Sequence, residues 1–137
     1  VVALASELGL TDVVSFHGRF QPEDLAGFLA GKHLGVALYF KDDLGDLLLP
    51  VKILEYIQAG LPVLSSNLET VQEYFDDESV CLFGTDEELS AKIVNIANDY
   101  AAARRSVKKA REIGAQIAWE SEASSYVEYL GKLCNRA

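Results

Sequence analysis

Continuous apolar runs that alternate with helix-like segments constrain most strongly how this chain can fold. Three of these runs are Leu34–Tyr39, Leu61–Ser66 and Ser79–Phe83. A fourth run, at residues 12–18, is β-branched and aromatic and ends at Gly18, which predicts another strand. Continuous apolar patterns indicate strands covered on both faces, and strands separated by helices indicate a parallel sheet. We therefore predict an α/β fold, a Rossmann-like parallel sheet of four strands with flanking helices.

Helices are expected between these strands and after the last of them. Glycine marks the end of two expected helices, at Gly9 and Gly60, and Thr85 with Glu88 three residues later is typical of a capping box. The expected helices cover residues 1–8, the segment that opens at Pro22, residues 50–59, residues 69–75 and most of the chain from residue 85 onward. We predict one partial domain over residues 1–137, with an α/β body at 1–83 and C-terminal helices at 84–137.

The composition excludes several classes of protein. The formal net charge is −9, and 13 of the 21 acidic side chains but only 4 of the 12 basic ones precede residue 84. An acidic body argues against binding to nucleic acid, which needs a basic surface. No apolar run approaches the roughly 20 residues of a membrane-spanning helix, and no signal peptide is evident. The two cysteines are too few for a disulfide framework or a zinc site, and a cytoplasmic location is expected.

The start of the sequence suggests a piece of a larger protein. The chain contains no methionine, and residue 1 falls within a segment of helical periodicity. We therefore expect that the chain begins partway through a longer protein.

The most informative segment is residues 49–66, a loop that leads through Pro50 into a helix and then, through Gly60, into a strand. The N-terminus of such a helix lies at the carboxyl edge of the sheet, where its free N–H groups can bind phosphate. Lys52 and Glu55 share one helical face near this end. A carboxylate one turn into the helix can accept hydrogen bonds from the hydroxyl groups of a ribose. These groups together predict a nucleotide-sugar site, although a solvated helix acid and a Lys52–Glu55 ion pair are the structural alternatives.

These residues resemble the C-terminal, donor-binding domain of the GT-B glycosyltransferases, and specifically the retaining group 1 family. The match comprises Glu55-Tyr56-Ile57-Gln58-Ala59-Gly60-Leu61-Pro62-Val63, with Pro50 and Lys52 ahead of it. Val14-Ser15-Phe16-His17-Gly18 is similar to the family's strand of the pattern Val-x-Phe-x-Gly, and Glu73 lies where the family often has glutamate. The resemblance extends over roughly residues 1–95 and implies a truncated GT-B half-domain that lacks its first strands.

The resemblance implies a role for each donor-binding residue. Glu55 would bind the ribose hydroxyls of a nucleotide diphosphate sugar, and the N–H groups of Val51 and Lys52, at a helix started by Pro50, would face the diphosphate. Gly18 and Arg19 would lie near the nucleobase. No residue of this chain is expected to be catalytic, and neither a cofactor nor a metal is expected.

The sequence departs from the family at one position. The family often has a second, earlier glutamate, and that position falls on Leu47. Carboxylates in the same loop are candidates to replace it, or to bind a metal, or to form a solvated acidic loop; they are Asp42, Asp43 and Asp46.

The intact enzyme implied by the resemblance transfers a hexosyl group, with retention, to a glycan or lipid-linked acceptor. Its other partner would be a missing N-terminal acceptor domain. The exposed strand edges leave three possibilities open: abnormal pairing of the strands, pairing between two copies, or the omission of segments that are present elsewhere in the native protein. The basic run at residues 104–111 is either a solvated helix face or a contact with the inner face of the membrane. Two other functions stay open: a different GT-B enzyme such as a nucleotide-sugar epimerase, and a non-catalytic interaction module.

Overall fold

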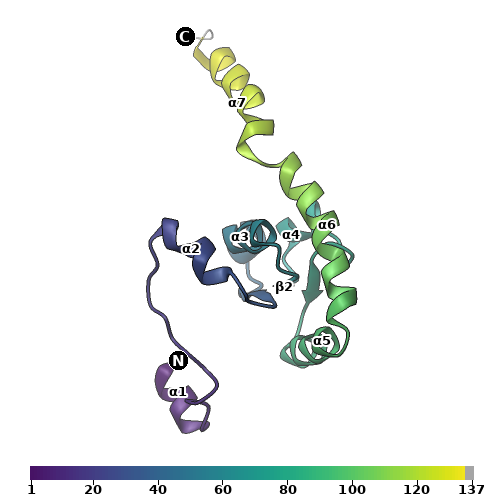
Figure 1. Cartoon of the computed structure of the whole chain (residues 1–137). Helices are drawn as coiled ribbons and strands as arrows, with labels where there is room; N and C mark the ends of the chain where they lie inside the picture. Colours follow the sequence, from purple (N-terminus) through teal and green to yellow (C-terminus); the bar gives the residue numbers. More distant parts are fainter. Residues whose placement is uncertain (135–137) are drawn as a thin grey trace. The chain divides into compact units, whose positions relative to one another are not determined.

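The computed structural model describes residues 1–134 and divides the chain into two compact units (Figure 1). The first unit comprises Val1–Ala30 and the second begins at Gly31. Each unit has its own internal contacts.

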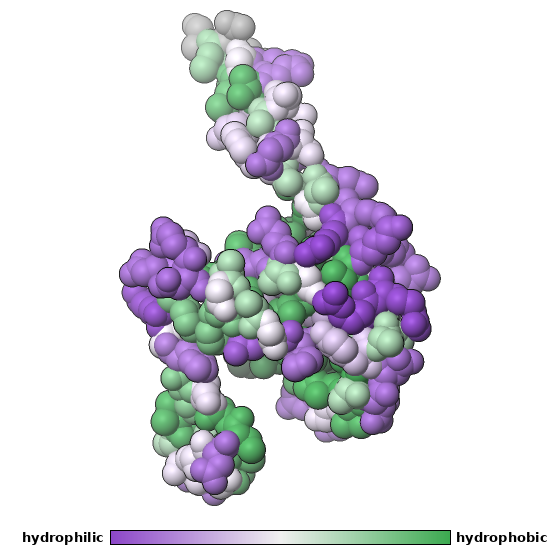
Figure 2. Space-filling view, viewed as in Figure 1, coloured by the Kyte–Doolittle hydropathy of each residue, from purple (hydrophilic) through white to green (hydrophobic). Residues whose placement is uncertain are grey.

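The first unit consists of two short helices and an irregular connection. The helices are α1 (Val2–Glu7) and α2 (Pro22–Leu29), and α2 begins with a proline followed by two acids. Both features suit the first turn of a helix, where one N–H is dispensable and the dipole is positive. Three aromatic rings gather in this unit: Phe28 lies 4.2 Å from Phe20 and 4.9 Å from His17, measured between ring centroids. Figure 2 shows apolar side chains on the surface of α1, among them Val2 and Leu4.

The prediction of a strand at residues 12–18 is wrong. Residues 11–13 form a turn, and residues 14–18 adopt no regular structure. A strand exists only where its N–H and C=O groups pair with a neighbouring strand. None of the described residues provides that neighbour, so the β-branched composition alone does not produce a strand.

The second unit contains a three-stranded parallel sheet. Its strands are β1 (Gly35–Ala37), β2 (Val63–Ser66) and β3 (Cys81–Phe83), in the order β1-β2-β3. Val36 pairs with Leu64, and Ser65 pairs with Leu82. The parallel α/β architecture is therefore confirmed, with three strands in place of four. β2 is buried along its whole length, as its continuous apolar pattern predicts.

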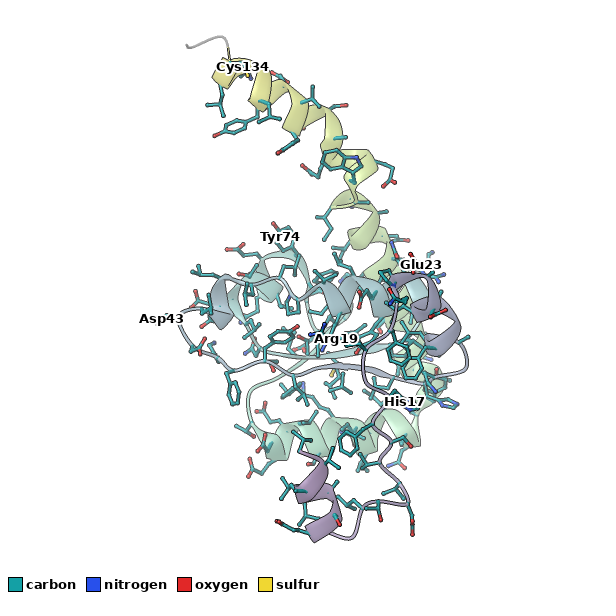
Figure 3. All side chains as sticks on the ribbon, turned by 90° about the vertical axis from the view of Figure 1, so that its left-hand side faces the viewer. His17, Arg19, Glu23, Asp43, Tyr74 and Cys134 are labelled. Atoms are coloured by element: carbon teal, nitrogen blue, oxygen red, sulfur yellow. The ribbon has the colours of Figure 1, made fainter. Side chains whose placement is uncertain are left out.

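Helices cover both faces of the sheet. α3 (Val51–Ala59) and α4 (Glu69–Tyr74) lie on one face and α5 (Asp86–Asn98) lies on the other (Figures 1 and 3). The chain continues through α6 (Tyr100–Gln116) to α7 (Trp119–Cys134), and a single 3-10 turn, Gly45–Leu47, lies in the loop before α3. Thr85 caps α5 as predicted, because its hydroxyl accepts a hydrogen bond from the Glu88 N–H.

The core lies between the sheet and α3. Ile53 and Ile57, one turn apart on α3, are 0% and 2% exposed, and they pack with a cluster of buried side chains from the sheet, α4 and α6. Burial of each isoleucine stabilises the fold by roughly 1.5–3 kcal/mol. α3 ends at Gly60, whose φ of 76° is the left-handed conformation that glycine adopts without strain.

The basic run at residues 104–111 holds α6 against the rest of this unit. Arg104 donates a hydrogen bond of 2.7 Å to the Gly60 carbonyl, and Arg111 donates to the carbonyls of Ile57 and Gln58. Ile57 and Gln58 belong to the last turn of α3 and Gly60 is its cap residue; the Ile57 carbonyl also accepts the Gly60 N–H at 3.0 Å. Two arginines therefore add hydrogen bonds to the carbonyls at the C-terminal end of α3. Among residues 1–134, no helix is both long and apolar enough to cross a bilayer.

The packing of Tyr56 on Gly35 gives a first prediction. A Cβ atom at Gly35 would lie 2.2 Å from Cγ of Tyr56, so Gly35→Ala is expected to destabilise the unit by about 1–3 kcal/mol through overpacking. Urea unfolding followed by circular dichroism measures the loss. Gly131→Ala is the matched control, since a Cβ there meets no atom within 4 Å and is expected to leave stability equal or slightly raised. Equal stabilities of the two variants would contradict this packing.

A second prediction concerns Lys109, whose Nζ lies 2.6 Å from Asp76 Oδ2 and 2.7 Å from Glu78 Oε2. Hydrogen bonds from Lys109 and Ser79 lower the pKa of Asp76. A lowered folded-state pKa gives stability that is present above the unfolded pKa and is lost as pH falls through the folded pKa. Lys109→Gln is therefore expected to lose less stability than the unchanged chain as the pH falls through and below the ordinary pKa of an aspartate.

The measurement is the urea midpoint of unfolding as a function of pH. Lys108→Gln is the control, because the Lys108 side chain is 88% exposed and its Nζ lies 3.9 Å from Glu112. An acid dependence that is identical in the two variants would rule out the contribution of Lys109.

Candidate functional site

The start of α3 presents two free backbone donors. Pro50 precedes the helix with extended backbone angles, and its carbonyl accepts the first hydrogen bond, from the Ile53 N–H at 3.0 Å. Proline has no N–H of its own, so Val51 and Lys52 supply the first amide donors of the helix. No residue in the described part of the chain accepts a hydrogen bond from either amide. These two N–H groups are therefore available to a ligand.

The topology places these donors at the edge of the sheet where ligands bind in parallel α/β folds. α3 runs from the carboxyl end of β1 back to the amino end of β2, with which β1 pairs in parallel. Its N-terminus therefore lies at the carboxyl edge, outside which open α/β sheets bind their ligands. The aligned peptide dipoles make this end positive, which favours an anion such as phosphate.

Glu55 lies one turn into the helix, on the side of α3 that is not fully covered. It is half-buried, and within residues 1–134 it forms no ion pair with Lys52 or with any other cation. The predicted alternative, an ordinary Lys52–Glu55 helix pair, is therefore not formed. Lys52 is exposed, and the Val51 side chain is 65% exposed. The four residues predicted from Pro50 to Glu55 thus share one helix end.

Tyr56 was not expected at this site, and it fixes the position of the turn that carries Glu55. Its ring lies against Gly35 of β1, where only a glycine leaves room for it. Burial raises the pKa of the Tyr56 hydroxyl, and the charge of Glu55 and the proximity of Tyr39 raise it further. The hydroxyl therefore stays protonated at neutral pH. The only sign of this contact in the sequence is a glycine at the start of a strand. Its aromatic partner, Tyr56, lies 21 positions further along the chain, so no local pattern connects the two residues.

The acidic loop before α3 is folded by its own carboxylates. Asp42 Oδ1 accepts a 2.7 Å hydrogen bond from the Gly45 N–H. Asp46 Oδ1 accepts one of 2.9 Å from the Glu69 N–H at the start of α4, and the Thr70 hydroxyl donates to the Asp46 carbonyl. Two of the three candidate carboxylates therefore already have structural partners.

Asp43 and Leu47 are the other two residues of interest in this loop. Asp43 lies at the outer end of the loop (Figure 3), and Leu47 is 77% exposed where the family often has glutamate. Within residues 1–134 no three histidine, cysteine, aspartate or glutamate side chains are grouped closely enough to hold a metal ion. The loop therefore offers Asp43 as its one carboxylate without a hydrogen bond among the described residues.

Gly18 and Arg19, the predicted nucleobase contacts, belong to the first unit. Gly18 has a φ of 70°, a turn conformation that suits glycine, and the Arg19 side chain is exposed. The structure brings Pro50, Val51, Lys52 and Glu55 together, and it describes Gly18 and Arg19 only within their own unit.

Comparison with known proteins identifies the family and the fold of the chain. The sequence pattern of the family described as glycosyl transferases group 1 matches residues 1–99. A search of curated proteins found none that matches the chain. Among solved structures, the chain is similar to a sucrose-phosphate synthase from Thermosynechococcus elongatus, with a TM-score of 0.86 and 24% sequence identity. That match covers 99% of this chain and 34% of the synthase chain, so this chain spans about a third of that protein's length. The predicted GT-B type of fold is confirmed.

The hydrogen bond that Asp46 accepts from the Glu69 N–H gives a prediction about the structural role of this carboxylate. Asp46→Ala removes the acceptor for the first N–H of α4, and it is expected to cost about 1 kcal/mol of stability, as the loss of a helix cap does. Hydrogen exchange at the Glu69 amide is expected to accelerate. Asp43→Ala, from the same loop, is the matched control and is expected to change neither quantity. Unchanged exchange at Glu69 in Asp46→Ala would show that this hydrogen bond does not form in solution.

Proposed function

Because the chain belongs to the group 1 glycosyltransferases, we propose that it is their donor-binding part and that the start of α3 binds a nucleotide diphosphate sugar. The observation that supports this most directly is the pair of amide donors at Val51 and Lys52, one turn before Glu55; within residues 1–134 neither amide has an acceptor and Glu55 has no ion-pair partner. In this proposal the diphosphate accepts hydrogen bonds from the two amides. The ribose hydroxyls donate to Glu55, and the Lys52 ammonium adds a positive charge beside the diphosphate.

The intact enzyme that we propose transfers a hexosyl group with retention to a glycan or lipid-linked acceptor. The acceptor is held by a separate N-terminal domain, and that domain also supplies the catalytic residues. The positive end of α3 stabilises the negative charge that develops on the departing diphosphate. This role needs no resident metal, since backbone N–H groups and one ammonium supply the positive charge.

One observation favours a second candidate, a non-catalytic module that keeps the fold. Leu47, 77% exposed, occupies the position where the family often has its first glutamate, and two neighbouring carboxylates are already engaged within the loop. Such a module would bind no nucleotide. A GT-B epimerase would bind one, and its reaction products would distinguish it from a transferase.

The test is a titration of the isotopically labelled chain with UDP, ADP and GDP, followed by amide NMR. We expect one nucleotide to shift the Val51 and Lys52 amides saturably. Glu55→Ala is expected to weaken its affinity roughly tenfold, because hydrogen bonds to a charged group contribute about 1.5–3 kcal/mol.

Glu122→Ala on α7 is the control, since it removes an exposed glutamate far along the chain and is expected to leave the affinity unchanged. If no nucleotide shifts these amides, the module is the better description. Equal affinities for Glu55→Ala and Glu122→Ala would exclude Glu55 from the ribose site.

A further inference from the structure

A cavity of about 430 Å³ lies at the amino edge of the sheet, opposite the edge at which α3 begins. The starts of the parallel strands β2 and β3 form it together with α5, α6 and the turn before β3, and its lining includes Val63, Cys81, Ile96, Arg105, Ser106 and Lys109. It lies wholly within the second unit, and no residue from Pro50 to Glu55 lines it. We refer to it as the amino-edge cavity.

Much of the lining of the amino-edge cavity is apolar. Val63 at the start of β2 is 2% exposed, and Pro62 before it is also buried. Ile96 of α5 and Ala102 and Ala103 of α6 are half-buried and supply further apolar groups. Because these side chains belong to a strand and two helices, the apolar surface is in place before a ligand arrives, which lowers the entropy lost on binding.

The acids that line the cavity already have cationic partners. Glu78 Oε2 lies 2.7 Å from Lys109 Nζ, and Asp77 Oδ1 lies 3.9 Å from Lys92 Nζ. Lys109 also lies 2.6 Å from Asp76 Oδ2, so it serves two carboxylates. The rim therefore carries no surplus of positive charge, which disfavours a ligand with several negative charges and favours one with a single charge.

Arg105 is the cation of the lining that these acids do not engage. Within residues 1–134 its side chain forms no hydrogen bond or ion pair, whereas Arg104 and Arg111 of the same helix bond to carbonyls at the end of α3. A guanidinium group is always charged and matches the geometry of a carboxylate with two parallel hydrogen bonds. The cavity thus combines an apolar surface with one available donor group for a carboxylate.

We propose that the amino-edge cavity binds a small organic carboxylate, whose two oxygens accept hydrogen bonds from the Arg105 guanidinium while its apolar body lies against Val63 and Ile96. A cavity of this size with apolar walls and one placed charge is typical of small-molecule sites. This site goes beyond the proposed function, because it lies at the opposite edge of the sheet from the start of α3 and shares no residue with the donor site.

The experiment titrates the labelled chain with carboxylates of different apolar size, followed by amide NMR. The probes are acetate, hexanoate and phenylacetate, with phenylacetamide as the neutral counterpart of phenylacetate and phenyl phosphate as the more highly charged one. We expect hexanoate or phenylacetate to shift the amides of Cys81, Ala103 and Ser106 saturably. Acetate lacks the apolar body and phenylacetamide lacks the charge, so each is expected to bind at least about tenfold more weakly.

Arg105→Gln tests the contact with the carboxylate. It is expected to weaken the binding of phenylacetate about tenfold and to leave that of phenylacetamide unchanged, since only the charged probe loses its partner. Arg105 is exposed, so its replacement leaves the fold intact. Lys108→Gln is the matched control: it removes one positive charge from the same helix, at a side chain that is 88% exposed and does not line the cavity.

Three results would overturn the inference. They are the absence of any shift of these amides with the carboxylates, equal affinities of Arg105→Gln and Lys108→Gln for phenylacetate, and tighter binding of phenyl phosphate than of phenylacetate. Competition with UDP, ADP and GDP separates the two sites, because a nucleotide that displaces phenylacetate from these amides would also overturn the inference. If phenylacetate shifts the cavity amides while no nucleotide shifts Val51 and Lys52, the proposed function fails and the carboxylate site stands.

Discussion

The position of α3 between the sheet and α6 is the constraint on which the second unit depends. Ile53 and Ile57 bury one face of the helix, Gly60 turns the chain into β2, and Arg104 and Arg111 bind the carbonyls of its last turn. Each contact involves the face or the C-terminal end of the helix. Within the described residues the first two amides of the helix have no acceptor, so the same packing that stabilises the fold leaves one end of α3 available for binding.

Contacts within the second unit also account for the basic run at residues 104–111 on α6. Arg104, Lys109 and Arg111 each contact α3 or the acidic turn at residues 76–78, so their charges are used within the unit. The acidic loop before α3 behaves in the same way, because Asp42 and Asp46 order the loop and connect it to α4. These three basic residues and these two aspartates therefore have partners within the second unit, whereas Glu55 and Lys52 do not pair with each other.

The sequence predicts the elements whose signals are local. Gly60, Pro62 and the buried pattern of β2 lie within a few residues of one another, and the helix and strand boundaries expected there agree with the structure to within two residues. The strand expected at residues 12–18 is absent because pairing depends on a neighbour, which no local pattern encodes. The contacts of Tyr56 with Gly35, of Arg111 with α3 and of Asp46 with Glu69 join distant segments, and only the folded structure shows them. The candidate residues from Pro50 to Glu55 belong to one helix end, which is why the sequence alone predicts that they lie together.

The central claim is that the free end of α3 binds the diphosphate of a nucleotide. A crystal structure of the chain with the nucleoside diphosphate that binds most tightly tests it directly. The account predicts phosphate oxygens within about 3 Å of the amide nitrogens of Val51 and Lys52, and ribose hydroxyls at a similar distance from the Glu55 carboxylate. A diphosphate bound to the arginines and lysines of α6, with the start of α3 empty, would contradict it.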